Sequence, residues 1–293
     1  MDATEFCLSI LESGDLAVKL APAPRDLDVR KHDQRAPTAP PDRPARSASL
    51  AMSGGAGRLP RPGQLGDPEA RARCIARFAH HELMAVELFA WALLRWPDQP
   101  AALKRGWLRV LSEEQEHCRL YVERLGALGF SLADFRHSDY FWKHIPSIGT
   151  SSHGIVAFLC AVGLTFEQAN LDFTPRYARA FRAVGDAATA RVCDLVHAEE
   201  IGHVALAATW VRRLTPGDAD AAPSDLVAAY EQAIPFPLSA ARAKGRPFDL
   251  EARRRAGLEA SFIEYVRSAR STVQLSNPAG DGVPGGDTRR PPQ

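Results

Sequence analysis

The sequence predicts an all-α protein, built as a long four-helix bundle with additional short helices toward its N- and C-terminal ends. Three observations predict this class. Between about residues 67 and 272, glycine and proline gather between long segments rather than inside them. Apolar residues in those segments recur at steps of three and four, the spacing of one helix face. The alternating pattern of a half-buried strand is sustained nowhere along the sequence.

The composition is that of an ordinary globular protein. The 293 residues are 45% hydrophobic and 24% charged, which leaves ample material for a core. The 36 basic and 35 acidic residues nearly cancel to a net charge of +1. A dedicated duplex-DNA-binding protein carries a marked basic excess, so this balance argues against one, although it leaves room for a local basic patch.

The cysteines and the apolar runs indicate a cytoplasmic protein without membrane contact. Five scattered cysteines, none in a CxxC pair, argue against a disulfide scaffold and against a cysteine zinc site. The longest apolar run, residues 155–166, is shorter than the roughly 20 residues that cross a bilayer. The N-terminus opens with acidic residues, so a signal peptide is not expected.

Composition changes along the chain predict four regions. Residues 1–20 read as a short amphipathic helix that docks on the main body. Residues 21–66 are rich in proline, arginine and small residues and predict a flexible linker. The helical bundle domain is expected over residues 67–272. Residues 273–293 share the composition of the linker and predict a disordered tail.

The first two bundle helices are expected at about residues 68–96 and 101–128. The sequence WPDQP between them has turn chemistry, and the second helix stops before Gly129. Their apolar stripes follow helical spacing throughout. They comprise Ile75, Phe78, Ala85, Val86, Phe89 and Leu93 in the first helix, and Trp107, Val110, Leu111, Cys118, Tyr121 and Leu125 in the second.

The second half of the domain follows the same plan. A helix at about residues 153–172 is apolar nearly all round at its start, which predicts a buried helix. Thr174 and Pro175 read as a cap followed by a proline at the first helical position, so a separate short helix is expected from there to about residue 184. Asp186 then caps a long helix to about residue 214. Two shorter helices are expected at 224–234 and 250–269.

Two copies of one motif interrupt the apolar stripes. The second helix contains EEQEH and the fourth contains EEIGH, so both spell EExxH. In each copy the second glutamate and the histidine are three residues apart and share a helix face. These pairs, Glu114 with His117 and Glu200 with His203, lie in line with core positions. A carboxylate in a core is costly unless it is paired or bound to metal, so the motifs indicate a binuclear metal site.

The other two long helices each offer one more glutamate for such a site. A di-metal carboxylate site in a bundle takes one glutamate from each of the remaining helices. Glu82 lies in the first helix, 32 residues before Glu114, and Glu167 lies in the third, 33 residues before Glu200. The two halves therefore repeat the same order of glutamate and ExxH with nearly the same spacing. An ExxH that occurs by chance would not produce this repeat.

Several assignments stay open at this level. Glu87 competes with Glu82 because it also follows the apolar stripe, but it lies only 27 residues before Glu114 and fits the repeat less well. We prefer Glu82 as the ligand and expect Glu87 to accept a hydrogen bond nearby. Glu113 and Glu199 each lie four residues before a histidine, so either could replace its neighbour.

Other residues near the motifs have two readings each. Asn170, one turn after the third-helix glutamate, could hydrogen-bond a ligand or a substrate, or only another helix. Tyr121 is either a redox-active phenol or a core tyrosine. Gly163 leaves space either for substrate or for close helix packing. His80 and His81 are expected at the surface or beside the ligands.

The order Glu, ExxH, Glu, ExxH resembles the ferritin-like di-iron carboxylate superfamily. Residues 80–130, 163–186, 197–215 and 241–263 are similar to an uncharacterised branch of it, a domain of unknown function, and the resemblance covers about residues 69–270. It implies a ferritin-like bundle and a metal site rather than one particular reaction. The metal ligands that it implies are Glu82, Glu114, His117, Glu167, Glu200 and His203.

The resemblance implies two iron ions as the cofactor, with manganese as the alternative. Four carboxylates and two imidazoles suit these metals better than zinc, and four glutamates cancel the charge of two divalent ions. The function expected is a di-iron oxidoreductase that uses dioxygen to oxidise or hydroxylate an unidentified small-molecule or nucleobase substrate. Because the sequence has no CxxC module, electrons are expected from a separate donor protein.

Two other classes of function remain as alternatives. One is a non-catalytic metal-binding or iron-storage protein, and the other is a ferritin-like interaction module. Storage requires assembly into a closed shell, which the proline-rich segment and the added terminal helices fit poorly. A monomer or a homodimer is the assembly expected for a catalyst.

Overall fold

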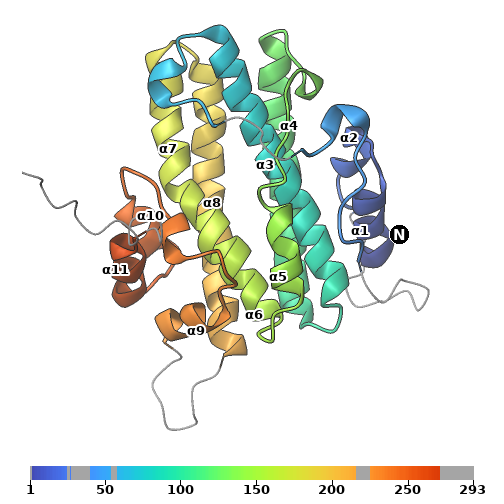
Figure 1. Ribbon diagram of the computed structural model, residues 1–293, viewed down its shortest axis with the longest axis vertical. Coiled ribbons are helices and arrows are strands. Elements are labelled where there is room, and N and C mark those ends of the chain that lie inside the picture. The colour runs from blue at the N-terminus through green and yellow to red at the C-terminus, as the bar shows by residue number, and fades with distance from the viewer. Residues whose placement is uncertain (1, 25–26, 28–39, 54–57, 216–224, 271–293) are drawn as a thin grey trace, which may run out of the picture.

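The computed structural model describes residues 2–24, 27, 40–53, 58–215 and 225–270. These residues are all-helical, with one isolated β-bridge and no strand among them, so the predicted all-α class is confirmed. Four long helical segments lie side by side (Figure 1). They are α3 (Pro68–Arg95), α4 (Ala101–Ala127), the continuous run of α6 (Ile155–Phe158), the π-helical segment η5 (Leu159–Glu167) and α7 (Gln168–Ala183), and α8 (Ala187–Leu214).

Shorter helices surround these four segments. Helices α1 and α2 lie against α3 (Figure 1). Of the C-terminal helices, α9 contacts α8, α10 contacts both α7 and α8, and α11 packs on α9 and α10. Helix α5 belongs to the connection between α4 and α6. Their bounds are α1 (Ala3–Glu12), α2 (Leu16–Lys19), α5 (Ile145–Gly149), α9 (Leu226–Ala233), α10 (Leu250–Arg255) and α11 (Ala260–Ser268).

The long helices begin where the sequence places capping residues. The Asp67 side chain accepts hydrogen bonds from the first backbone amides of α3, and Pro68 occupies the first helical position, where its missing N–H is no loss. The Asp186 side chain accepts from the Thr189 amide and starts α8, as predicted. Capping satisfies backbone groups that the helix itself leaves unpaired, so these two boundaries depend on local sequence alone.

Two of the short predicted helices are each divided in the structure. The N-terminal segment forms α1 and α2 because Asp15 caps the second one through the Ala17 amide. The predicted helix at 250–269 is interrupted between α10 and α11 at Gly257, whose φ of 69° is in the left-handed region. Glycine adopts this conformation without a steric penalty, which makes it a frequent residue at helix C-termini.

The predicted helix boundary at Thr174 and Pro175 is wrong. Helix α7 continues through Pro175, although proline supplies no amide hydrogen and costs about 3 kcal/mol inside a helix. Tyr177 and Phe181, which follow the proline on the buried face, bury their rings in the core. Each such ring contributes roughly 1.5–3 kcal/mol, so packing beyond the proline offsets its local cost.

The described parts of the predicted linker pack against the helices. Leu50 and Leu65 are buried, and the hydroxyl of Tyr177 donates to the carbonyl of Pro60 at 2.7 Å. For residues 40–53 and 58–66 the prediction of flexibility is therefore wrong, because these contacts hold them on the protein. The rest of that linker, at 25–26, 28–39 and 54–57, and the predicted tail at 273–293 lie outside the described residues.

A buried ion-pair network anchors the N-terminal segments to α3. Glu87 is fully buried and contacts Lys19 Nζ at 2.9 Å and Arg46 Nη2 at 2.7 Å. The Trp142 indole N–H donates to the same carboxylate at 3.0 Å, and Lys19 also donates to the Ile10 carbonyl. Three segments that are distant in sequence are thus joined at one side chain of α3.

A second buried ion pair holds the C-terminal helices. Arg253 of α10 donates to both carboxylate oxygens of Asp172 on α7, at 2.8 and 2.9 Å. The same carboxylate accepts from the backbone amides of Gly245 and Asp249. Both carboxylate oxygens of Asp172 therefore have hydrogen-bond partners within the protein.

The most apolar helical run is a core element. Residues 155–183 form one helical stretch that is long and apolar enough to cross a membrane by length and composition. However, 83% of its most apolar window is buried inside the protein. This is the pattern of the core helix of a soluble protein, and it confirms the predicted burial of the third helix.

Gly163 lies where η5 contacts α8 most closely. A Cβ atom at this position would come 2.2 Å from the Cβ of Ala207, so close helix packing explains the glycine, and substrate space does not. We expect Gly163→Ala to lower the free energy of unfolding by about 1–3 kcal/mol, because overpacking forces the helices apart. Urea unfolding measures this change.

The matched control is Gly126→Ala, whose added Cβ meets no atom within 4 Å. It should leave stability unchanged or raise it slightly, since alanine is the better helix former. Combining Gly163→Ala with Ala207→Gly should recover part of the loss. Equal unfolding midpoints for Gly163→Ala and the unsubstituted chain would contradict the packing argument.

Candidate metal centre

The two EExxH motifs face each other across α4 and α8. Their inner glutamates and histidines are almost fully buried: Glu114, His117 and Glu200 are 0% exposed and His203 is 2% exposed. The three-residue spacing puts each glutamate beside its own histidine on the inner helix face. The two histidine rings lie 6.0 Å apart between centroids, so the motifs meet in one place.

The other two glutamates come from the remaining long segments. Glu82 of α3 is 5% exposed, and Glu167, at the end of η5, is 3% exposed. The wide turn of η5 is held by Thr165, whose hydroxyl hydrogen-bonds the Cys160 carbonyl at 2.8 Å and the Tyr230 hydroxyl at 2.7 Å. π-Helical segments occur often at functional sites, and this one ends on a residue of the cluster. Local sequence offers no signal for it.

The structure brings all six predicted side chains together. They form two groups, and within each group one ligand atom per residue lies within 4.8 Å of the others. Glu114 and Glu200 belong to both groups, so the groups overlap. The first contains Glu82, Glu114, His117 and Glu200, and the second contains Glu114, Glu167, Glu200 and His203.

Several atoms of the cluster have no hydrogen-bond partner among the described residues. Oε1 of Glu114, Oε2 of Glu200 and Nδ1 of His203 are buried and make none, although the imidazole nitrogen lies 3.1–3.2 Å from both oxygens. Buried polar atoms are normally satisfied, and buried carboxylates are normally paired or bound to metal. The donor set therefore fits a metal ion, which would take up these free electron pairs.

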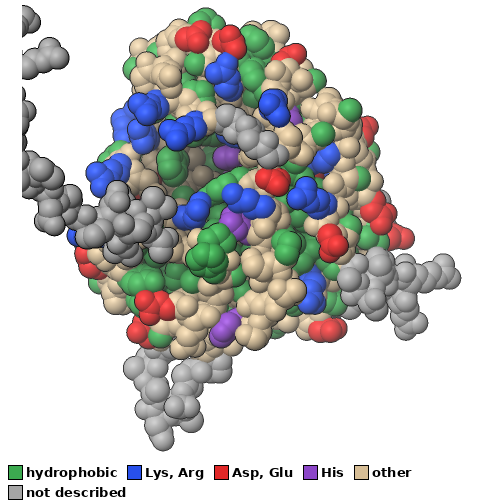
Figure 2. Space-filling model, in the orientation of Figure 1, with side chains coloured by type: hydrophobic (Ala, Val, Ile, Leu, Met, Phe, Trp, Pro, Cys, Tyr) green, Lys and Arg blue, Asp and Glu red, His purple; other side chains and the backbone are tan. Residues whose placement is uncertain are grey.

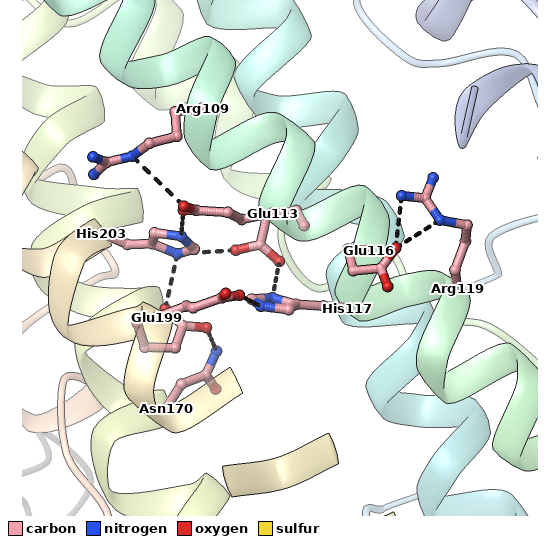
Figure 3. Close-up of polar contacts among 10 residues, drawn as sticks. Arg109, Glu113, Glu116, His117, Arg119, Asn170, Glu199 and His203 are labelled. Carbon is pink, nitrogen blue, oxygen red and sulfur yellow. Dashed lines mark hydrogen bonds and ion pairs between the residues drawn. The ribbon is translucent and has the colours of Figure 1, made fainter. Parts of the chain in front are cut away.

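The outer glutamate of each motif binds the histidine of the other motif. Glu199 accepts from Nε2 of His117 at 2.6 Å, and Glu113 accepts from Nε2 of His203 at 2.8 Å (Figure 3). A proton held on Nε2 leaves Nδ1 as the nitrogen that faces the cluster. Glu113 and Glu199 thus contact the outer side of the site, where such carboxylates orient imidazole ligands. Sequence reasoning had left them only as substitutes for their neighbours.

Asn170 supports the cluster from α7. Its side-chain amide donates to Oε1 of Glu200 at 2.8 Å, which is the first of the alternatives that the sequence left open. The bond leaves Oε2 of Glu200 directed toward His203 Nδ1 at 3.2 Å. Asn170 therefore selects which oxygen of this shared carboxylate faces the histidine.

Glu87 lies apart from the cluster. The ion pairs with Lys19 and Arg46 occupy its carboxylate, whereas Glu82 lies within the first group. The choice left open between the two residues is thereby decided by geometry in favour of Glu82 as the member of the cluster. Glu87 does accept a hydrogen bond, as expected, but from Trp142 and not from a residue of the cluster.

In the absence of metal, protons compensate the clustered charge. Burial and then neighbouring carboxylates raise the pKa of Glu82 and Glu167 well above the usual value. Burial also opposes the charge of Glu114, but His117 and His203 outweigh it and lower the pKa of Glu114 to about 2. Burial lowers the pKa of His117, yet Glu114 outweighs that effect and raises the pKa to about 10. Metal binding must therefore displace protons.

A pocket of about 230 Å³ reaches the cluster at Glu82. Asn170 and His81 also line it, and Arg242 lies at its wall. Most of the remaining lining is aromatic. We call this the aromatic pocket. Its aromatic residues come from three long helical segments and one connection, and they are Phe78, Tyr121, Tyr140, Phe141, Phe166 and Phe173. A small, largely apolar group could enter it and lie beside the cluster.

The structure shows the surroundings of three residues whose role the sequence left open. The Tyr121 hydroxyl contacts Cys193 Sγ at 3.6 Å in the core, and burial raises the pKa of this phenol, which therefore keeps its proton. His81 is half-buried in the aromatic pocket. The surface reading of His80 is wrong, because this residue is 0% exposed and stacks on His137 with ring centroids 4.5 Å apart.

Sequence reasoning did not find the aromatic pocket or Arg242. The lining residues come from α3, α4, η5, α7 and three connecting segments, so no single spacing relates them. The only signal in the sequence is a run of aromatic residues at 140–142. In the structure, Phe141 stacks on Phe166 beside the site, with ring centroids 4.5 Å apart.

The fold and the site define a class: an all-helical protein with two overlapping, buried Glu/His clusters that could hold metal ions. The chain belongs to the family described as "Protein of unknown function (DUF455)", whose family model matches residues 13–264. The predicted similarity to a domain of unknown function is thereby confirmed.

A curated relative is also similar to this chain. An uncharacterized protein from Haemophilus influenzae (strain ATCC 51907 / DSM 11121 / KW20 / Rd) is 29% identical over 154 residues. The match covers 50% of this chain and 52% of that protein, so the chain spans about half the length of the curated relative. No solved structure matches the chain.

Proposed function

We propose that this chain is a ferritin-like di-metal carboxylate enzyme that uses dioxygen to oxidise or hydroxylate a small substrate. One observation carries the proposal: six buried glutamate and histidine side chains from four long helical segments form two overlapping groups beside an aromatic pocket. Oxidoreductases of this superfamily use the same kind of donor set in a bundle core.

Two iron ions are the proposed cofactor, with manganese as the alternative. The donors are carboxylates and imidazoles, without a thiolate, which suits these metals better than structural zinc. Glu114 and Glu200, which belong to both groups, would be the shared ligands, and four carboxylates cancel the charge of two divalent ions. When bound, reduced iron would supply electrons to dioxygen and open coordination positions.

The residues around the cluster have separate tasks in this proposal. Glu113 and Glu199 keep the Nε2 proton on the two histidines and so leave Nδ1 available. Asn170 orients the shared carboxylate of Glu200. The aromatic pocket excludes water and holds the substrate next to Glu82. A separate protein is proposed as the electron donor.

The test is metal content combined with a visible spectrum. We expect anaerobically purified, iron-loaded protein to hold about two ions per chain, as a di-metal site requires. Ferric absorbance should bleach with dithionite and return with oxygen. Protein that retains only zinc, or no metal, and does not respond to oxygen would contradict the proposal and favour an interaction module. A closed shell with far more iron per chain would favour storage.

A further inference from the structure

A second pocket, of about 790 Å³, adjoins the aromatic pocket and is lined by cations. We call it the cationic pocket. Its basic residues are Arg176 of α7, Lys244 and Arg246 of the connection before α10, Arg267 of α11 and Arg270 just after it. Among the residues that the structure describes, no acidic one lines this pocket. On the face of the molecule drawn in Figure 2, a hollow with hydrophobic side chains inside it has Lys and Arg side chains on its rim.

The nearest carboxylates do not neutralise these cations. Both oxygens of Asp172 are occupied by Arg253 and by backbone amides. Glu264 comes only to 4.0 Å from Arg267, and both side chains are more than half exposed, where such pairs contribute little. The pocket therefore keeps an excess of positive charge in a chain whose net charge is only +1.

The cations also repel one another. Burial lowers the pKa of Lys244, and the charges of Arg246 and Arg253 lower it further, although Asp172 and Glu264 act in the opposite direction. Like charges gathered in one pocket favour the binding of an anion. Several arginines suit phosphate in particular, because the planar guanidinium can donate two parallel hydrogen bonds to its oxygens.

The two pockets share a wall. Phe173 lines both of them, and Arg242 lines the aromatic pocket from the same connection that carries Lys244 and Arg246. The Arg242 guanidinium donates to the Tyr140 hydroxyl at 2.8 Å, at the wall of the aromatic pocket. One ligand can therefore have an apolar ring in the aromatic pocket and a negative group in the cationic pocket.

We propose that the cationic pocket binds the phosphate of a nucleotide whose planar base enters the aromatic pocket. The size of the aromatic pocket, about 230 Å³, fits a small ring system and not a large cofactor. Aromatic walls stack on a base from any nucleotide, and the cations hold its phosphate. That this nucleotide is the substrate rests on the proposed function, whereas its binding does not.

Calorimetric titration of the full chain with AMP, adenosine and inorganic phosphate tests the proposal. We expect AMP to bind at least tenfold more tightly than either fragment, and its affinity to fall as sodium chloride screens the charges. The double variant Arg176→Ala/Arg246→Ala should lose at least tenfold in AMP affinity and leave adenosine binding unchanged. Pyrophosphate should compete with AMP on the unsubstituted chain, which provides a test that needs no variant.

The matched control is Arg179→Ala/Arg254→Ala, which removes the same charge from α7 and α10 outside both pockets. It should bind AMP within twofold of the unsubstituted chain. Equal affinity for AMP and adenosine, equal loss in both double variants, or no competition by pyrophosphate would overturn the proposal. Circular dichroism and thermal unfolding check that both variants are folded.

Two further experiments identify the source of the nucleotide and distinguish the nucleotide site from the proposed oxidase. A short single-stranded oligoadenylate that binds at least tenfold more tightly than AMP would assign the site to a nucleotide within RNA, and equal affinity would assign it to a free nucleotide. Titration of chelator-treated chain separates nucleotide binding from the metal centre. If the chain binds AMP but neither holds metal nor responds to oxygen, the nucleotide site is supported and the proposed oxidase is contradicted.

Discussion

Replacing Glu114 or Glu200 by alanine is expected to remove both metal ions from the chain. Each carboxylate belongs to both groups of the cluster, so its loss takes a ligand from two ions at once. Glu82→Ala and Glu167→Ala each affect one group only and should leave about one ion bound. Metal analysis after purification in equal iron measures the difference between the two kinds of variant.

Glu116→Ala is the matched control for this series. Glu116 lies on the same helix, between two residues of the cluster, but its carboxylate is half exposed and pairs with Arg119 at 2.8 Å. Its replacement should leave about two ions per chain. If Glu114→Ala is folded by circular dichroism and still binds as much metal as the control, the shared-ligand assignment is wrong.

Glu87→Ala is expected to destabilise the protein by about 3–5 kcal/mol without a direct effect on the metal centre. Removing this carboxylate leaves Lys19 and Arg46 buried without their counter-charge, and an uncompensated buried cation is costly. The Trp142 indole N–H also loses its acceptor. Urea unfolding of the metal-free chain measures the loss directly.

The control for the stability measurement is Glu69→Ala. Its ion pair with Arg73 is exposed on the first turn of the same helix, and exposed pairs contribute about 0–1 kcal/mol. Glu87→Gln separates charge from shape, since the amide can still accept from the indole but cannot neutralise the two cations. Unfolding midpoints for Glu87→Ala that match the Glu69→Ala control would show that the anchor contributes little.

The paired glutamates of the EExxH motif have different roles. The inner glutamate lies in the cluster, and the outer one accepts a hydrogen bond from the histidine of the opposite helix. Each of α4 and α8 therefore supplies both a member of the cluster and the support for its partner helix. The extra glutamate explains why both helices carry EExxH. The shorter ExxH would already supply the two residues of the cluster.

The two proposals describe one continuous region with two kinds of chemistry. Buried carboxylates and imidazoles could hold metal ions, and the aromatic pocket beside them shares Phe173 with a pocket lined by cations. The tests are independent because metal content, oxygen response and AMP binding are measured separately.

Local sequence was sufficient for most helices and for the members of the cluster. Helix α3 begins at Pro68 and α8 after its cap Asp186, as predicted, because a helix start depends on residues three positions apart or fewer. The spacing of Glu114 and His117 places both on one face for the same reason. The repeated order of the motifs then indicated all six side chains that the structure brings together.

Predictions failed where contacts distant in sequence outweighed a local signal. Pro175 would end an isolated helix, but the burial of Tyr177 and Phe181 carries α7 through it. Arg46 belongs to a stretch with linker composition, yet Glu87 holds it in the protein. Neither outcome is readable from neighbouring residues, because the stabilising partner is supplied by packing.

The sequence by itself thus determined the helices and which carboxylates and imidazoles share an inner face, since helical geometry relates residues only a few positions apart. Only the tertiary structure decided which glutamate of each motif faces the cluster, and it alone separated Glu82 from Glu87. It also formed the two adjoining pockets. These depend on side chains from different segments, whose distances are set by how the helices pack and not by their order in the chain.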